Sequence, residues 1–197
     1  MSANEEAREA ITRATVDLIE QSGGDIRNIT ARSISERSGV SLGLINYHFG
    51  SKDELIALCC GRIINRTIAA FAPGRKDYSE EDGMTDAERL TSYAAQTFDF
   101  IYKNSATVKI SVLSDLKDYT PGCNSAMTQK GFLMALREDI PDQRKKHIAF
   151  CLASIMQAAF LSGEHSGEIT GYDLKTKKGR DLFIKDTVNM LMGGLYE

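Results

Sequence analysis

The stretch that decides the fold spans residues 30–49 and reads TARSISERSGVSLGLINYHF. Thr30 and Ser41 are residue types that favour helix N-caps, and each precedes a short segment with an inward apolar residue, Ile34 and then Ile45. Gly39 lies between the two segments, where a tight turn needs a residue that tolerates a positive φ. This is the pattern of a helix-turn-helix unit, whose second helix can enter the major groove of DNA. A generic helical hairpin satisfies it too, so the pattern alone leaves both interpretations open.

The segments that flank this unit also have helical periodicity. A helix is predicted over residues 4–21, because apolar residues recur on one stripe, and Ser22-Gly23-Gly24 should end it. Ser51 and Glu54 have the spacing of a capping box that opens a fourth helix, which should run toward Pro73. The polar residues 74–83 then form a plausible loop.

The remainder of the chain is predicted to be helical as well. Thr85 and Glu88 form a second possible capping box, which opens a helix with an apolar face. Further helices are predicted over residues 108–116, 126–136, 143–162 and 176–193, with a Gly-rich polar loop over residues 163–170. The predicted fold is therefore all-α, with a three-helix DNA-binding domain in residues 1–50. A helix joins it to a larger helical domain in residues 51–197.

The charge of the chain is unevenly distributed. The 197 residues carry a formal net charge of −3, which by itself argues against nucleic-acid binding. Between residues 27 and 52, however, four basic residues face one acidic residue, a local charge of +3; they are Arg27, Arg32, Arg37 and Lys52 against Glu36. Such a segment can attract phosphate, while the acidic remainder of the surface discourages loose DNA binding.

At these positions the sequence resembles the DNA-binding signature of the tetracycline-repressor (TetR) family. The resemblance covers about the N-terminal quarter of the chain: residues 29–41 and then Gly43, Ile45, His48, Phe49, Lys52 and Leu55. Alanine is more usual in the family where this chain has Ser35 and Ser38, and tyrosine is common where it has Asn46. The resemblance implies a homodimeric, bacterial transcriptional regulator that binds double-stranded operator DNA. It also implies that residues 51–197 form a dimerisation and effector-binding domain, and that a small-molecule effector relieves repression.

The resemblance and the helix geometry together assign the DNA contacts. Phosphate contacts are expected from Thr30, Tyr47, His48 and Lys52, and base contacts from Ser41, Leu42, Gly43 and Asn46. Arg32 completes the predicted DNA-binding set. Asparagine can form a bidentate pair with adenine, which makes Asn46 the strongest candidate for reading sequence. Simpler roles stay open: Thr30 and Ser41 as helix caps, His48 as a packing residue and Lys52 as a surface charge.

The C-terminal region has no specific motif, so its roles follow from position. Aromatic and apolar residues suggest an effector pocket, although such a stripe also fits plain core; they are Phe98, Ile101, Tyr102, Met127 and Phe132. The wide apolar faces of the last two long helices predict a four-helix dimer interface. The residues predicted to form it are Leu152, Ile155, Met156, Ala159, Phe160, Leu182, Val188 and Leu191.

The sequence predicts neither an enzyme nor a cofactor. His147 and His165 lack the spacing of metal ligands, and no nucleophile elbow, phosphate-binding glycine loop or Cys-x-x-Cys pair is present, so no catalytic or metal site is expected. Four scattered cysteines are expected to be free thiols. The first residues lack a signal-peptide pattern and no apolar run is long enough for a membrane span, which predicts a cytoplasmic protein.

One alternative stays open at this point. The chain can also be read as a helical dimeric regulator or adaptor that uses no small ligand and is controlled by a protein partner.

Overall fold

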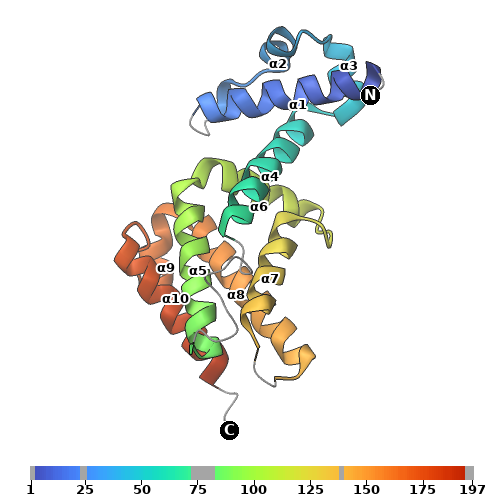
Figure 1. Ribbon diagram of the computed structural model, residues 1–197. Helices are drawn as coiled ribbons and strands as arrows, with labels where there is room; N and C mark the ends of the chain where they lie inside the picture. The colour runs from blue at the N-terminus through green and yellow to red at the C-terminus, as the bar shows by residue number, and fades with distance from the viewer. Residues whose placement is uncertain (1–2, 23–25, 72–82, 138–139, 194–197) are drawn as a thin grey trace. The chain divides into compact units, whose positions relative to one another are not determined.

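The computed structural model describes residues 3–22, 26–71, 83–137 and 140–193, and every regular element within these ranges is helical (Figure 1). The prediction of an all-α fold is therefore confirmed. In chain order the elements are α1 (Ala3–Gln21), η1 (Ile26–Asn28), α2 (Ala31–Ser38), α3 (Leu42–Phe49), α4 (Lys52–Phe71), α5 (Asp86–Lys103), α6 (Ser105–Lys117), α7 (Asn124–Ala135), α8 (Asp142–Leu161), η2 (Gly163–His165), α9 (Ser166–Thr170) and α10 (Lys177–Met192).

The helices form two compact units. Unit 1 comprises Met1–Thr67 and Asn104–Asp118, and unit 2 comprises Ile68–Lys103 and Tyr119–Glu197. The chain passes from unit 1 to unit 2 within α4, so a continuous helix makes this connection. It returns to unit 1 for α6 and then goes back to unit 2. The sequence suggests a different division, at residue 50, between a DNA-binding domain and a dimerisation and effector-binding domain. That division stays a prediction.

Unit 1 is built around a small apolar core beneath the helix-turn-helix. Ile11 of α1, Ile34 of α2 and Ile45 of α3 are completely buried, and Leu55 of α4 joins them. Ile110 of α6 packs against the same cluster. Burial of each such side chain contributes roughly 1.5–3 kcal/mol, which is enough in sum to hold three short helices in fixed positions.

Two of the predicted helix caps form both reciprocal hydrogen bonds of a capping box, and a third forms one of them. The Thr30 hydroxyl accepts from Ser33 N–H at 3.0 Å, and the Ser33 hydroxyl accepts from Thr30 N–H. Thr85 and Glu88 form the same reciprocal pair, and the hydrogen bond from Thr85 N–H lowers the pKa of Glu88. At the start of α4, Glu54 N–H donates to the Ser51 hydroxyl at 3.2 Å.

The predicted loop over residues 163–170 is wrong. This segment forms η2 and then α9, because Gly167 is accommodated inside a helical turn and the Thr170 hydroxyl donates to Ser166 C=O at 2.6 Å. Gly171, with φ of 78°, ends α9. Helix boundaries also shift slightly, since α6 begins at Ser105 and α7 at Asn124. The predicted helix end at Gly23-Gly24, Pro73 and most of the predicted loop 74–83 lie outside the described residues.

Aromatic side chains fill the core of unit 2, where α5 packs against α7, α8 and α10. Phe98 of α5 is completely buried, with ring centroids 5.1 Å from Tyr102 and 5.7 Å from Phe183. Tyr102 meets Phe160 of α8 at 5.7 Å. One side of α5 is thereby joined to α8 and α10 through contacts between rings.

The cysteines are free, as the sequence predicts: Cys59, Cys60, Cys123 and Cys151. Burial raises the pKa of the Cys59 thiol to about 12 and that of Cys60 to about 11, so neither is a reactive thiolate near neutral pH. Within the described residues, no group of three or more potential metal ligands occurs. In the same residues, no single helix is long and apolar enough to cross a membrane, although the bent pair of α8 with residues 163–170 passes on length and composition.

Candidate nucleic-acid interface

The turn between α2 and α3 is held by backbone and side-chain hydrogen bonds. Gly39 has φ of 69° and donates its N–H to Ser35 C=O at 3.0 Å. The Ser35 hydroxyl donates to Val40 C=O at 2.6 Å, and Val40 N–H donates to the Ser38 hydroxyl at 3.2 Å. The two serines that depart from the usual alanines therefore fasten the turn, a role that alanine cannot fill.

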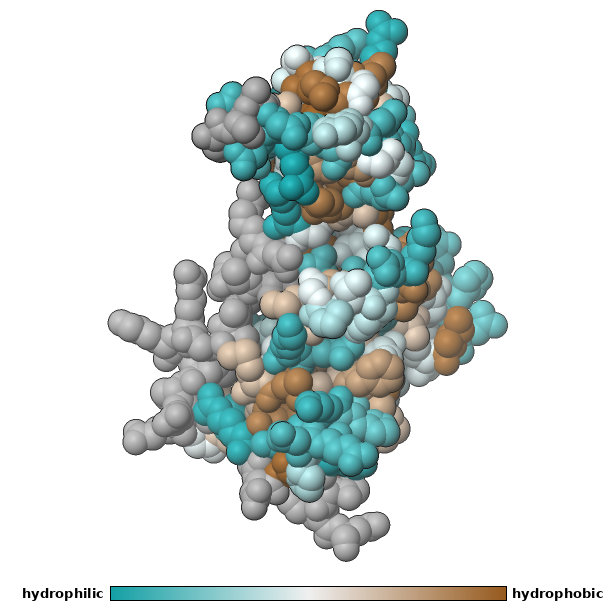
Figure 2. All heavy atoms as spheres, turned by 90° about the vertical axis from the view of Figure 1, so that its right-hand side faces the viewer, coloured by the Kyte–Doolittle hydropathy of each residue, from teal (hydrophilic) through white to brown (hydrophobic). Residues whose placement is uncertain are grey.

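Helix α3 presents one face to the core of unit 1 and another to solvent. Ile45 and Phe49 are buried, whereas Tyr47 is 74% exposed and Leu42 is 47% exposed. Figure 2, which draws one face of the molecule, shows hydrophobic residues at the surface among hydrophilic ones. An outward face that carries apolar, amide and hydroxyl groups suits the edges of DNA bases, including the methyl group of thymine.

Ser41 occupies the N-cap position of α3 but does not cap it with its side chain. Its backbone is extended, with φ of −64° and ψ of 149°, and its hydroxyl makes no cap hydrogen bond. Ser41 therefore stands at the predicted N-cap position, but the hydrogen bond expected from its side chain is not formed. Ser41, Leu42, Gly43 and Asn46 are all exposed at this end and face of the helix, so the structure brings the predicted base-contacting residues together.

The predicted phosphate-contacting residues lie at the start of α2, near the end of α3 and at the start of α4. Thr30 is exposed at the start of α2. His48 is half-buried between the rings of Tyr47 and Phe49, and among the described residues its Nε2 has no hydrogen-bond partner. Lys52 opens α4, and its Nζ lies 3.3 Å from the carboxylate of Asp53. Unpaired N–H groups and the dipole at the start of a helix favour an anion at such a corner.

Among the predicted DNA-binding residues, Arg32 forms an ion pair within its own helix. Its Nε donates to the Glu36 carboxylate at 2.9 Å, one turn along α2, and both side chains are largely exposed. An exposed ion pair of this kind is weak, so DNA phosphate can compete for the guanidinium.

Helix α1 brings an arginine to the end of α3, one that the sequence pattern did not indicate. The guanidinium carbon of Arg8 lies 5.6 Å from the centroid of the Phe49 ring, at the end of α3. No local signal links two residues so far apart in the chain.

The five predicted effector-pocket residues lie in different surroundings in unit 2. Phe98 and Tyr102 are in contact, while Phe132 is completely buried and meets Tyr93 at 5.6 Å. Ile101 is half-buried, and Met127 is 42% exposed. Ring packing occupies the space around Phe98, so any ligand there has to displace or reorient aromatic side chains.

The eight predicted interface residues also divide by burial within one protomer. Leu152, Met156, Ala159, Phe160 and Val188 are buried in the core of unit 2. Ile155 and Leu191 are half-buried, and Leu182 is 49% exposed. Phe150 and Met190, which the sequence analysis did not single out, are 55% and 67% exposed on the same two helices.

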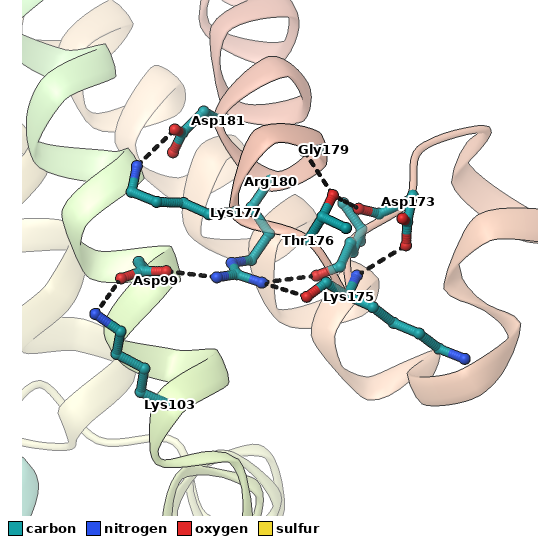
Figure 3. Close-up of polar contacts among 10 residues, drawn as sticks. Asp99, Lys103, Asp173, Lys175, Thr176, Lys177, Gly179, Arg180 and Asp181 are labelled. Carbon is teal, nitrogen blue, oxygen red and sulfur yellow. Dashed lines mark hydrogen bonds and ion pairs between the residues drawn. The ribbon is translucent and has the colours of Figure 1, made fainter.

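A buried ion pair fixes α10 against α5 (Figure 3). The Arg180 guanidinium donates to the Asp99 carboxylate at 2.5 Å and to the carbonyl groups of Leu174 and Lys175. The Lys103 ammonium lies 2.7 Å from the other oxygen of Asp99. Hydrogen bonds from Lys103 and then Arg180 lower the pKa of Asp99. The pair thus connects α5, α10 and the segment that precedes α10.

Comparison with known proteins agrees with this geometry. Residues 11–59 match the family model described as bacterial regulatory proteins, tetR family. The fold is similar to that of a TetR transcriptional regulator from Rhodococcus sp. RHA1, with 13% identity, a TM-score of 0.66 and coverage of 98% of this chain and 100% of that one. It is also similar to another transcriptional regulator from Rhodococcus sp. Rha1, with 18% identity, a TM-score of 0.56 and coverage of 98% and 97%. A comparison with curated proteins found no match. Residues 11–59 therefore resemble the DNA-binding domain of the tetR family of bacterial regulatory proteins, and the chain as a whole shares the fold of these two transcriptional regulators.

Proposed function

We propose that the protein is a repressor that binds a pseudo-palindromic operator as a homodimer and releases it when a small, largely apolar effector binds. The observation that carries the proposal is the exposed face of α3. The turn that precedes α3 is held in place by Gly39 and by the hydrogen bonds of two serines. A recognition helix needs a rigid support, because misplaced side chains lose their hydrogen bonds to bases. Such a repressor acts on chromosomal DNA, and the proposal therefore places it in the bacterial cytoplasm.

The proposed DNA contacts combine base reading with phosphate anchoring. Asn46 reads a base, with Ser41, Leu42 and Gly43 beside it in the major groove. Thr30, Arg32, Tyr47, His48 and Lys52 hold the phosphates, and the amino end of α4 adds its dipole. The hydroxyl of Ser41 supports its role, because it is exposed and makes no helix-cap hydrogen bond, and so has hydrogen-bonding capacity to offer.

The proposed dimer interface lies on α8 and α10. Exposed apolar side chains on both helices support it, since apolar side chains that a protomer leaves exposed can be covered by a partner. Leu182, Leu191 and Ile155 are the members of the predicted set that are accessible to a partner, and Phe150 and Met190 extend them. The buried members of the set support the interface from behind by fixing the two helices.

The proposed effector site lies among the aromatic side chains of unit 2, at Phe98, Ile101, Tyr102, Met127 and Phe132. Binding there has to shift packed rings, and α4 offers a route for the shift because it continues without a break from unit 2 to Lys52. The proposed effect is a changed separation of the two recognition helices.

A second candidate function is a regulator without a small ligand, controlled by a protein partner. The complete burial and ring packing of Phe98 and Phe132 favour this reading, since both residues behave as ordinary core. Exposed apolar residues of α7 such as Met134, which is 58% exposed, offer a surface for such a partner.

An electrophoretic mobility-shift assay on the intergenic DNA beside the protein's own gene tests the proposal, with and without candidate apolar ligands. The repressor reading predicts a discrete complex that a ligand dissolves. A complex that survives every ligand and is dissolved by a protein from the same cell supports the second candidate. Absence of any complex with duplex DNA contradicts both.

A further inference from the structure

We propose that Arg8 is a DNA-phosphate ligand that the ring of Phe49 holds beside the recognition helix. The inference rests on the proposed DNA-binding function and adds a contact from α1 to those expected from α2, α3 and α4. Arg8 lies outside the matched residues 11–59 and outside the signature that the sequence resembles.

The position of Arg8 follows from the packing of α1 against α3. The two helices are in contact within unit 1, and Figure 1 shows the amino-terminal end of α1 beside α3. The Arg8 guanidinium carbon lies 5.6 Å from the centroid of Phe49, the last residue of α3. Phe49 is only 8% exposed, so its ring is a fixed platform. A guanidinium attracted to a ring face loses rotational freedom but keeps all five N–H donors for another partner.

Among the described residues, the charge of Arg8 is not paired with a carboxylate, unlike that of two other arginines of unit 1. Arg62 lies 3.5 Å from the Glu9 carboxylate, and Arg32 is paired with Glu36. Among the residues that the structure describes, no carboxylate pairs with the Arg8 guanidinium, which contacts the Phe49 ring instead. The Arg8 side chain is also exposed to solvent. A preoriented, unneutralised guanidinium is well suited to a phosphate, with which it can form two parallel hydrogen bonds.

The surroundings of Arg8 point to the DNA backbone. Phe49 ends α3, and Lys52, an expected phosphate ligand, begins α4 three residues later. Arg8 and Lys52 therefore approach the same α3–α4 corner, one from α1 and the other from α4. Two cations at one corner can neutralise neighbouring phosphates of one strand, which fixes the angle at which α3 enters the groove.

Arg13 offers a matched control. It lies on the same helix, carries the same charge and is also exposed, and among the described residues it forms no ion pair or ring contact. The two variants Arg8→Gln and Arg13→Gln thus remove the same charge from α1 with the same side chain. Because both side chains are exposed, neither change threatens the core, and thermal melting by circular dichroism verifies that the fold is kept.

The test is fluorescence anisotropy of a labelled, short, mixed-sequence DNA duplex with the full-length protein over a range of salt concentrations. For Arg8→Gln, we expect the slope of log K against log salt to fall by about 0.9 and the affinity at about 0.15 M salt to fall on the order of five-fold. Arg13→Gln should match the wild type. Arg8→Lys should keep the slope, because the charge is retained, and should bind less tightly than wild type because the fork of donors is lost.

Two results overturn the inference: an unchanged slope for Arg8→Gln, or equal losses for both glutamine variants, which indicate a distant charge effect. If the wild-type protein shows no salt-dependent binding, the DNA-binding proposal itself fails. That result is distinguishable, because it appears before any variant is compared.

Discussion

Asn46 and Lys52 lie close together in the chain, yet they should make different kinds of contribution to DNA binding. Asn46 is exposed on α3 and can exchange two hydrogen bonds with one base. Lys52 is half-buried at the start of α4 and can offer only a charge to the backbone. Reading the sequence and anchoring the protein are therefore separable at the level of single residues.

The first prediction concerns this separation. Asn46→Ala should cost about 1–3 kcal/mol on the operator, change which bases are tolerated, and leave binding to random DNA unchanged. Lys52→Ala should weaken binding to all sequences alike and lower the salt slope by about 1. Titration of both variants on operator and random duplexes checks this. If Asn46→Ala loses as much affinity for random DNA as for the operator, Asn46 does not read a base.

A second prediction concerns the serines of the turn. Ser35→Ala removes the donor that binds Val40 C=O at 2.6 Å and should lower the free energy of unfolding by about 1 kcal/mol. Ser33→Ala, on the same helix, tests the cap of α2 at a similar cost, so it is the comparison for an equal loss of one hydroxyl. The two variants should differ in DNA binding, because only Ser35 fixes the turn before α3. Equal operator affinity for both variants contradicts this role.

At the scale of elements, the ion pair of Asp99 and Arg180 is the main polar connection described between α5 and α10 (Figure 3). Both side chains are about nine-tenths buried, so removal of one partner leaves a poorly hydrated charge. Arg180 also holds the carbonyl groups of Leu174 and Lys175. This guanidinium therefore adds a polar connection to the apolar packing that positions α10, one of the two proposed interface helices.

The third prediction follows from this pair. Arg180→Met should lower the free energy of unfolding by about 3 kcal/mol, because Asp99 loses its buried partner. Asp181→Asn breaks an exposed pair with Lys177 of similar length and should cost less than about 0.5 kcal/mol. Urea unfolding at neutral pH compares the two variants. Equal losses would show that the burial of Asp99 has no energetic consequence.

The pH dependence of stability gives an independent check on the same pair. The folded-state pKa of Asp99 is lowered from the ordinary value of 3.8, so its contribution is fully present above pH 3.8 and is lost as the pH falls through the lower, folded-state pKa. Asp99→Asn should therefore be less stable than wild type at neutral pH and lose less stability on acidification. A variant that loses stability in acid as steeply as wild type contradicts the assignment.

The elements of unit 1 could be predicted from the sequence because their signals are local. Thr30, Gly39 and the spacing of buried isoleucines specify the helix-turn-helix within twenty residues or so of chain. The short helix within residues 163–170 could not be predicted, because glycine and polar residues fit a loop as well as a short helix. Contacts such as those of Arg8 with Phe49 and Asp99 with Arg180 join distant positions, which no periodicity reveals.

At the scale of the whole molecule, apolar periodicity indicated the faces of α8 and α10 but not what covers them. Leu152 and Val188 turn out to serve the core of their own protomer, whereas Leu182 is left accessible. A pattern of apolar residues cannot separate these cases, since both faces exclude water in a dimer. Only the packing of a protomer shows which apolar residues remain for a partner.

The fourth prediction concerns the dimer. Leu182→Arg and Leu191→Arg should give monomers with weak operator affinity, because each places an unpaired charge in the proposed interface. Ile169→Arg is the control, since Ile169 is 68% exposed on α9 and outside the proposed interface. Sedimentation velocity distinguishes dimers from monomers. If both leucine variants sediment like wild type, the interface lies elsewhere.

The fifth prediction concerns the effector. A ligand that releases the operator must bind the free dimer more tightly than the DNA-bound one, by the same factor that it weakens DNA binding, typically 5–150-fold. Isothermal titration of the ligand with and without operator duplex measures this factor. A ligand that binds both forms equally cannot be the inducer.

The most direct test of the central claim, that exposed α3 reads DNA in a symmetric dimer, is selection of bound sequences from a random duplex library by the full-length protein. We expect one enriched motif with two-fold symmetry and half-sites about 34 Å apart or somewhat more, on one face of the DNA. We also expect Asn46→Ala to alter symmetric positions in both half-sites. No enriched motif, or a motif without a dyad, would contradict the account.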